Sequence, residues 1–150
     1  MFNTPQIPTP SGLNLIQAVT RVLSNYATFS GRASRSEYWW WTLAQFLALF
    51  VPVFLMIGVA AATGTDPGDG AAAGFFGLWV IVVVLGGLVP TIAVNVRRLH
   101  DIGQSGWLCL LVFIPSLGGI ALLVLCALPS QPVGNQYGLA PVGSKPPFQL

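Results

Sequence analysis

The amino-acid sequence predicts an all-α integral membrane protein. Only 7% of its 150 residues are charged, against about 25% in an ordinary soluble domain, whereas 54% are hydrophobic. The charges are clustered, so they leave uncharged runs at residues 38–65, 70–96 and 102–144. Each run is longer than the roughly 20 apolar residues that cross a bilayer core about 30 Å thick. The net charge of +2 is too small to indicate a nucleic-acid partner.

The N-terminal part is expected to hold a disordered lead and an amphipathic helix. Residues 1–12 lack the basic and apolar blocks of a signal peptide. Residues 13–26 repeat apolar side chains with the helical period of 3.6, yet they are too polar to span a membrane. We expect this helix to lie in the membrane interface, and the alternative is a soluble helix packed under the bundle. Its apolar face consists of Leu13, Ile16, Val19, Leu23 and Tyr26.

Residues 29–41, FSGRASRSEYWWW, predict the start of the first membrane helix. Ser34, with Glu37 three positions later, forms a capping-box pattern. Arg32 and Arg35 lie beside this cap, and aromatic residues follow it. Indole and phenol rings favour the headgroup level, where one end of the ring is apolar and the other is wet. The expected interfacial anchors are Tyr38, Trp39, Trp40, Trp41 and, before the third segment, Trp107.

Two membrane spans are expected at about residues 41–62 and 71–94, joined by a turn at 63–70. Pro52 predicts a kink in the first span, which membrane helices tolerate when a neighbour satisfies the freed carbonyl. Pro90 follows a pair of glycines and makes the second span bendable. That bend is either a gated hinge or a static kink filled by a neighbour.

A third apolar segment, at about residues 107–128, is interrupted near its centre by proline and glycine at 115–119. At about 1.5 Å per residue it is just long enough to cross the membrane as one helix. The alternative is a re-entrant hairpin that enters the membrane and returns. Residues 13–128 are thus expected to form one helical membrane domain, and 129–150 an irregular tail.

The positions of the arginines predict the orientation in the membrane, because cytoplasmic loops carry an excess of basic residues. The N-terminal flank and the loop at 95–107 are basic, whereas the turn at 63–70 has no basic residue. We therefore expect the N-terminus and the 95–107 loop to be cytoplasmic. Three full crossings would place the C-terminus outside, and a re-entrant third segment would return it to the cytoplasm.

Four of these arginines are expected to lie on one face at one depth, where guanidinium groups can bind phosphate with paired hydrogen bonds. Basic pockets of this kind bind anionic lipid headgroups. The alternative is that these residues only set the topology and pair with Glu37 and Asp101. The expected contacts to a lipid or partner are Arg32, Arg35, Arg97, Arg98 and His100.

His100 and Asp101 are adjacent, but they are not accompanied by further side chains at the spacing of metal ligands. No serine–histidine–acid set and no phosphate-binding glycine loop is apparent either. We therefore expect no catalytic residue, no metal site and no cofactor. His100 is expected to be an interfacial side chain near Asp101 or a helix end, able to titrate near neutral pH. Cys109 and Cys126 are expected to be buried thiols.

Four blocks in order carry a resemblance to a known family: FSGRASRSEYWW at 29–40, RRLHDIGQSGW at 97–107, IPSLGG at 114–119 and GNQYG at 134–138. Together they resemble the YhaH-like family of small bacterial inner-membrane proteins, a domain of unknown function. The resemblance covers about residues 20–141 and implies a helical protein of the bacterial cytoplasmic membrane, with no established activity. If the GNQYG block joins the arginines and His100 in one site, the tail is cytoplasmic, which favours the re-entrant third segment.

The expected function is that of a small, non-enzymatic interaction or structural protein of the inner membrane. Its cytoplasmic-face arginine cluster would engage membrane lipid, a membrane protein partner or a second copy of the chain. The alternative is a subunit of an oligomeric small transporter or channel. The spans carry no ionisable residue of the kind that usually marks an ion path, which argues against that alternative.

Overall fold

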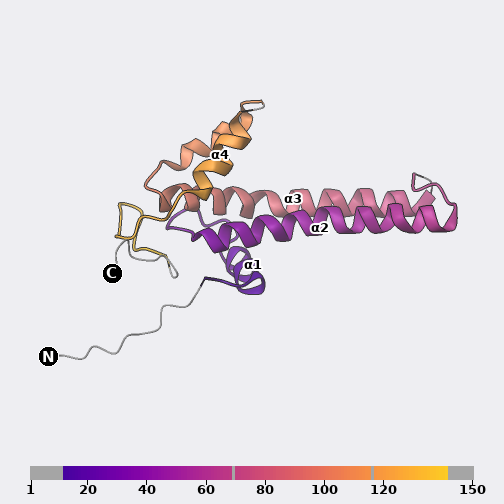
Figure 1. The fold of residues 1–150 in the computed structure, drawn as a ribbon, viewed down its shortest axis with the longest axis horizontal. Coiled ribbons are helices and arrows are strands. Elements are labelled where there is room, and N and C mark those ends of the chain that lie inside the picture. The colour runs from indigo at the N-terminus through magenta and orange to yellow at the C-terminus, as the bar shows by residue number, and fades with distance from the viewer. Residues whose placement is uncertain (1–11, 69, 116, 142–150) are drawn as a thin grey trace.

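The computed structural model describes residues 12–68, 70–115 and 117–141. In these residues the elements are all helical, apart from one isolated bridge between Asn135 and Gly138. Two long helices run side by side as a hairpin, a shorter hairpin leaves one end of it obliquely, and a short N-terminal helix lies against that same end (Figure 1). The expected lead, residues 1–12, and the last residues of the expected tail, 142–150, fall almost wholly outside the described part.

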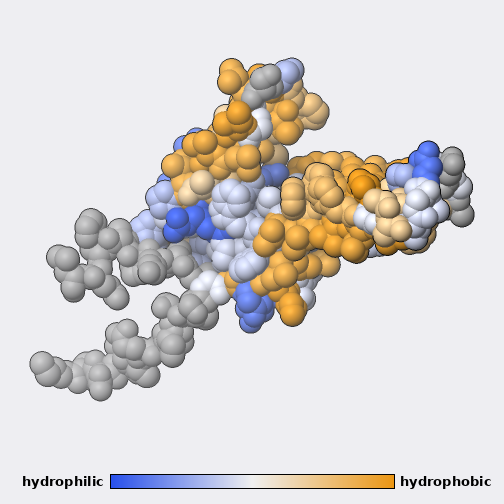
Figure 2. Space-filling view, turned by 45° about the vertical axis from the view of Figure 1, so that its right-hand side comes forward, coloured by the Kyte–Doolittle hydropathy of each residue, from blue (hydrophilic) through white to orange (hydrophobic). Residues whose placement is uncertain are grey.

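The long hairpin consists of α2, Arg35–Thr63, and α3, Gly70–Asp101. At 1.5 Å per residue the two helices are about 44 and 48 Å long, which exceeds the roughly 30 Å of a bilayer core. Both are long and apolar enough to cross a membrane. Gly64, with φ of 69°, ends α2 in the left-handed conformation that glycine adopts without steric cost. Figure 2 shows apolar surface along this hairpin.

Pro52 lies inside α2, and the neighbouring helix supplies the hydrogen bond that this proline removes, as expected; the kink itself stays a prediction. Proline has no N–H, so Pro52 cannot bond to the carbonyl of Ala48 one turn earlier. The indole Nε1–H of Trp79, on α3, donates to that carbonyl at 2.9 Å. The neighbouring helix thus replaces the missing backbone bond, as a helix in hydrocarbon requires.

Pro90, inside α3, also has a neighbour that replaces its lost backbone bond, which favours a static site filled by neighbours over a gated hinge. It leaves the carbonyl of Gly86 without its helical donor, and the hydroxyl of Tyr26, just after α1, donates to it at 2.9 Å. The side chain of Gln45 packs on Gly87, where an added Cβ would lie 1.8 Å from Gln45 Nε2. Pro90 itself is fully buried. Side chains from two other segments therefore pack against α3 in the turn before Pro90.

The third apolar segment is a hairpin, not one long helix. Its first arm is the 3-10 helix η1, Gly106–Phe113, and its second arm is α4, Gly118–Ala127. The arms pack together so closely that a Cβ on Gly118 would lie 1.6 Å from the carbonyl oxygen of Leu111. After α4 the chain returns to the end of α3, where the N–H of Gln131 donates to the carbonyl of Asp101 at 3.1 Å. Of the two alternatives, the structure has the returning form.

The N-terminal helix α1, Leu15–Ser24, begins at a complete capping box formed by Asn14 and Gln17, a pattern that our reading of the sequence missed. Ala18 and Val22 are buried and lie on the side that packs on the bundle, whereas Ile16 is 76% exposed. The buried stripe is therefore narrower than the predicted apolar face. The location of α1 relative to a membrane stays a prediction.

The start of α2 agrees with the predicted cap only in part. The hydroxyl of Ser34 accepts the N–H of Glu37 at 3.2 Å, as expected. The carboxylate of Glu37, however, turns towards arginines of other segments. The packed core lies around this cap, at the junction of all the helices, and consists of Val22, Ala33, Tyr38, Trp41, Val94, Leu99, Ile102, Leu122 and Cys126.

Candidate functional site

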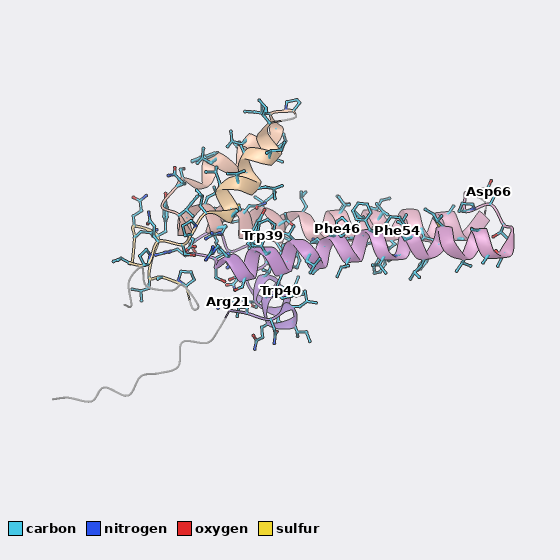
Figure 3. The ribbon with its side chains drawn as sticks, viewed as in Figure 1. Arg21, Trp39, Trp40, Phe46, Phe54 and Asp66 are labelled. Carbon is cyan, nitrogen blue, oxygen red and sulfur yellow. The ribbon has the colours of Figure 1, made fainter. Side chains whose placement is uncertain are left out.

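The polar residues gather at the end of the long hairpin where α2 begins and α3 ends, away from the turn that carries Asp66 (Figure 3). We call this region the charged end, and define it by Arg21, Arg32, Arg35, Glu37, Arg97, Arg98, His100 and Asp101. Two carboxylates organise it, each bridging two arginines. All these residues belong to the described part of the chain.

Asp101 is the centre of the first group. Its carboxylate is fully buried, and its Oδ1 accepts the Nε–H of Arg32 at 2.9 Å, with the Nη2 of the same arginine at 2.8 Å. Its Oδ2 pairs with the Nη1 of Arg98, one turn earlier on α3. Arg32 comes from the loop before α2, 69 positions away in sequence. The group therefore joins that loop to the end of α3.

The remaining donors of these two arginines hold the chain after α4. Arg32 Nη1 donates to the carbonyl of Val133 at 2.9 Å, and its Nη2 donates to the carbonyl of Gln131. Arg98 Nε donates to the carbonyl of Cys126 at 2.9 Å. This carbonyl lies at the C-terminus of α4, where the negative end of the helix dipole attracts a positive charge. Arg32 and Arg98 thus tie the returning tail to the long hairpin.

Glu37 is the centre of the second group. Its Oε1 lies 2.8 Å from the Nη1 of Arg97, and its Oε2 lies 3.4 Å from the Nε of Arg21. The side chain of Glu37 is 1% exposed and that of Arg97 is 5% exposed, whereas that of Arg21 is 40% exposed. This group therefore links α1, α2 and α3, and only its Arg21 side reaches the surface.

His100 contacts both the loop before α2 and the tail. Its Nδ1 lies 3.2 Å from the carbonyl of Gly31, so Nδ1 carries the proton in this contact and Nε2 is an acceptor. Its ring stacks on that of Tyr137, with ring centroids 3.8 Å apart and planes 5° apart. The side chain of Asn135 donates to the backbone carbonyl of His100 at 2.8 Å.

The predicted arginine cluster is therefore mostly internal. Arg32, Arg97 and Arg98 are buried and paired with Glu37 or Asp101, which confirms the pairing that we gave as the alternative. Arg35, the first residue of α2, is exposed. For Arg32 and Arg98, a carboxylate and backbone carbonyls replace the hydration that the guanidinium loses on burial. Arg97 has the carboxylate of Glu37 as its ion-pair partner, but its Nε and Nη2 are buried with no hydrogen-bond partner.

Of the aromatic residues expected as interfacial anchors, some are buried and others are exposed. Tyr38 and Trp41 are each only 5% exposed and belong to the core, a correction to the expected role. They face α1, α3 and α4 because the third segment returns over them, and the indole of Trp41 donates to the hydroxyl of Thr91. Trp39 and Trp107 are exposed at 44% and 79%, and Trp40 is half-buried.

Several functional contacts were absent from the sequence prediction. Arg21 was counted only towards orientation, yet it pairs with Glu37. Gln131 binds the end of α3 through its backbone N–H and through its side chain, which donates to the carbonyl of Ile102. A lone glutamine in a tail carries no local signal for such a contact. Both cysteines are free thiols, and among the described residues no three His, Cys, Asp or Glu side chains group as metal ligands would.

Comparison with known proteins agrees with this architecture. The family described as "Protein of unknown function (DUF805)" matches residues 26–139. The chain belongs to the DUF805 family. Its relatives include the inner membrane protein YhaH of Escherichia coli K12, 35% identical over 123 residues, which cover 81% of this chain and 93% of YhaH. The inner membrane protein YhaI of the same strain is 33% identical over 122 residues, which cover 80% of this chain and 91% of YhaI. No solved structure matches the chain.

The family places this chain among inner-membrane proteins, in agreement with the two spanning helices. The block at 97–107, which carried the resemblance, contains Arg97, Arg98, His100 and Asp101. In this DUF805 member those residues hold the charged end together.

Proposed function

We propose that this DUF805 member is a non-enzymatic protein of the inner membrane whose charged end lies in the cytoplasmic headgroup layer and binds anionic lipid. The observation that carries the proposal is the imbalance of charge at that end. Five arginines gather there against two carboxylates, whereas the described part of the opposite turn carries only the acidic Asp66. Anionic headgroups would neutralise the excess.

The geometry assigns the lipid contact to particular arginines. Arg32, Arg97 and Arg98 are buried and each pairs with Glu37 or Asp101, so they shape the site without reaching a lipid. Arg21, on α1, and Arg35, at the start of α2, both reach the surface. Trp39, one turn after Arg35, is exposed, and a ring beside a guanidinium suits the boundary between headgroup and chain.

The test compares lipid selectivity in variants of the exposed arginines. The Arg21→Gln/Arg35→Gln protein is purified in nanodiscs made from equal amounts of phosphatidylglycerol and phosphatidylcholine, and the lipids that remain on the protein are counted by native mass spectrometry. Each basic residue near an anionic surface contributes about 1 kcal/mol, so we expect the preference for phosphatidylglycerol to fall at least about fivefold.

The control is the Arg21→Lys/Arg35→Lys protein, which keeps both charges and should keep the preference. Asp66→Asn at the opposite turn should also leave it unchanged. If the glutamine variant retains the same ratio of the two lipids as the unaltered protein, the exposed arginines do not bind headgroups and the proposal fails.

The alternative of an oligomeric transporter or channel has no particular support among the described residues. The cavities between α2 and α3 hold about 140 and 230 Å³, and the larger is lined mainly by aliphatic side chains and glycine. We therefore do not propose it.

A further inference from the structure

A cavity of about 640 Å³ lies between α3, η1, the loop before α2 and the tail. It is separate from the arginine groups, and none of its lining residues is Arg, Lys, Asp or Glu. Four of the lining side chains are aromatic rings: Phe29, His100, Trp107 and Tyr137. Its size falls within the roughly 300–1,000 Å³ of ordinary small-molecule pockets.

The cavity has one polar end. The imidazole of His100 uses Nδ1 for the carbonyl of Gly31, so Nε2 is left as a hydrogen-bond acceptor. Gly106 lies beside that nitrogen: a Cβ there would be 3.1 Å from His100 Nε2 and 2.7 Å from Val96. The absence of a side chain at Gly106 keeps room beside the acceptor. The stack on Tyr137 fixes the orientation of the ring.

The opposite end of the cavity is apolar and open at the surface. Ile92 and Leu110 line it and are 40% and 53% exposed, on α3 and η1 respectively. Ile92 lies eight positions before His100 on one helix, which is about 12 Å along the axis. The cavity therefore runs from the exposed apolar part of α3 to the polar end of the molecule.

We propose that this cavity binds an uncharged membrane lipid with a hydroxylated aromatic head, the chemistry of a membrane quinol. The absence of an ionised lining group disfavours a phosphate head, because a buried charge requires a partner. The neutral imidazole nitrogen accepts a hydroxyl hydrogen, the aromatic walls suit a flat ring, and the end at Ile92 and Leu110 admits a hydrocarbon tail from the bilayer. The proposal concerns binding alone, and it is independent of headgroup binding at Arg21 and Arg35.

The experiment measures binding of radiolabelled decylubiquinol to the full chain in phosphatidylcholine nanodiscs. We expect saturable binding to the unaltered protein. Ile92→Trp places a larger side chain in the cavity and should weaken binding about tenfold or more. Its matched control is Ile81→Trp, at an exposed isoleucine of α3 outside the cavity, which should bind as the unaltered protein does. Leu110→Trp fills the cavity from η1 and gives a second, independent variant.

The hydrogen bond is tested with the oxidised ligand. Decylubiquinone has carbonyl oxygens where the quinol has hydroxyls, so it cannot donate to His100 Nε2, and we expect it to bind about three- to tenfold more weakly. In His100→Phe, which keeps a flat ring against Tyr137, the preference for the quinol should disappear.

Three results would overturn the proposal. The first is binding that does not saturate, or that Ile81→Trp and Ile92→Trp reduce equally, because either shows partition into the bilayer. The second is equal competition by diacylglycerol, which has a hydroxyl but no ring. The third is binding only by a chain ending at Pro141, because the cavity would then be the site of this protein's own residues 142–150.

Discussion

At the scale of single residues, Asp101 carries the connection between three parts of the chain. Its carboxylate accepts from Arg32 and Arg98, and its backbone carbonyl accepts from Gln131 and Arg32. A buried ion pair of this kind contributes little over a well-packed apolar alternative, but the loss of one partner leaves charges buried without compensation. Removal of the Asp101 carboxylate would therefore leave the guanidinium groups of Arg32 and Arg98 buried without a charged partner.

The first prediction follows for Asp101→Asn. The substitution keeps the shape and removes the charge between two buried guanidinium groups, so the free energy of unfolding should fall by about 3–5 kcal/mol. Unfolding in mixed detergent, followed by circular dichroism, measures the change. Asp66→Asn, at the exposed turn, is the control and should cost less than about 0.5 kcal/mol. Equal unfolding midpoints for the two variants would show that the Asp101 group is not a structural clamp.

At the scale of elements, each proline-containing spanning helix receives its missing hydrogen bond from another helix or its flank. The indole of Trp79 donates to the carbonyl freed by Pro52, and the hydroxyl of Tyr26 donates to the carbonyl freed by Pro90. These bonds connect α2 with α3, and the segment after α1 with α3. The prolines in the sequence set where the backbone bonds are missing, and tertiary contacts replace those bonds.

The second prediction is a double-mutant cycle around Pro90 in α3. Tyr26→Phe removes the donor to the carbonyl of Gly86 and should lower the free energy of unfolding by about 0.5–1.5 kcal/mol. Pro90→Ala supplies a backbone N–H for the same carbonyl, so in that background Tyr26→Phe should cost measurably less. Additive effects of the two changes would mean that the hydroxyl does not substitute for the missing helical bond.

At the scale of the whole molecule, the returning third segment determines where the described part of the tail lies. The described tail meets the charged end through Arg32, Gln131 and Asn135, on the same end of the long hairpin as α1. Two spanning helices with a hairpin that returns predict that Gly12 and Pro141, the two ends of the described chain, lie on one side of a membrane. The basic excess at the charged end predicts that this side is the cytoplasm.

The third prediction concerns this topology in cells. Alkaline phosphatase fused after the C-terminus should be inactive and green fluorescent protein fused there should be fluorescent, because both report a cytoplasmic location. Phosphatase inserted at the turn containing Asp66 should be active. Phosphatase activity at the C-terminus would mean that the third segment crosses the membrane, contrary to the hairpin.

The sequence alone determined the membrane class, the two spanning helices, the cap at Ser34 and the backbone bonds lost at Pro52 and Pro90. Each depends on composition or on residues within about one turn of one another, and such local preferences act before any tertiary contact forms. The prediction that Glu37 and Asp101 pair with the arginines was also available, because these carboxylates lie within the basic blocks.

Only the tertiary structure decided which arginine met which carboxylate, and that Arg32, Arg97 and Arg98 lost their exposure while Arg35 kept it. It also decided that the third segment returns, that Tyr38 and Trp41 are core residues, and that a cavity opens beside His100. These outcomes join segments as distant as Arg32 and Asp101, 69 positions apart. Burial and pairing at that separation depend on how whole helices pack, and a hydrophobic pattern read along one segment contains no information on its neighbours.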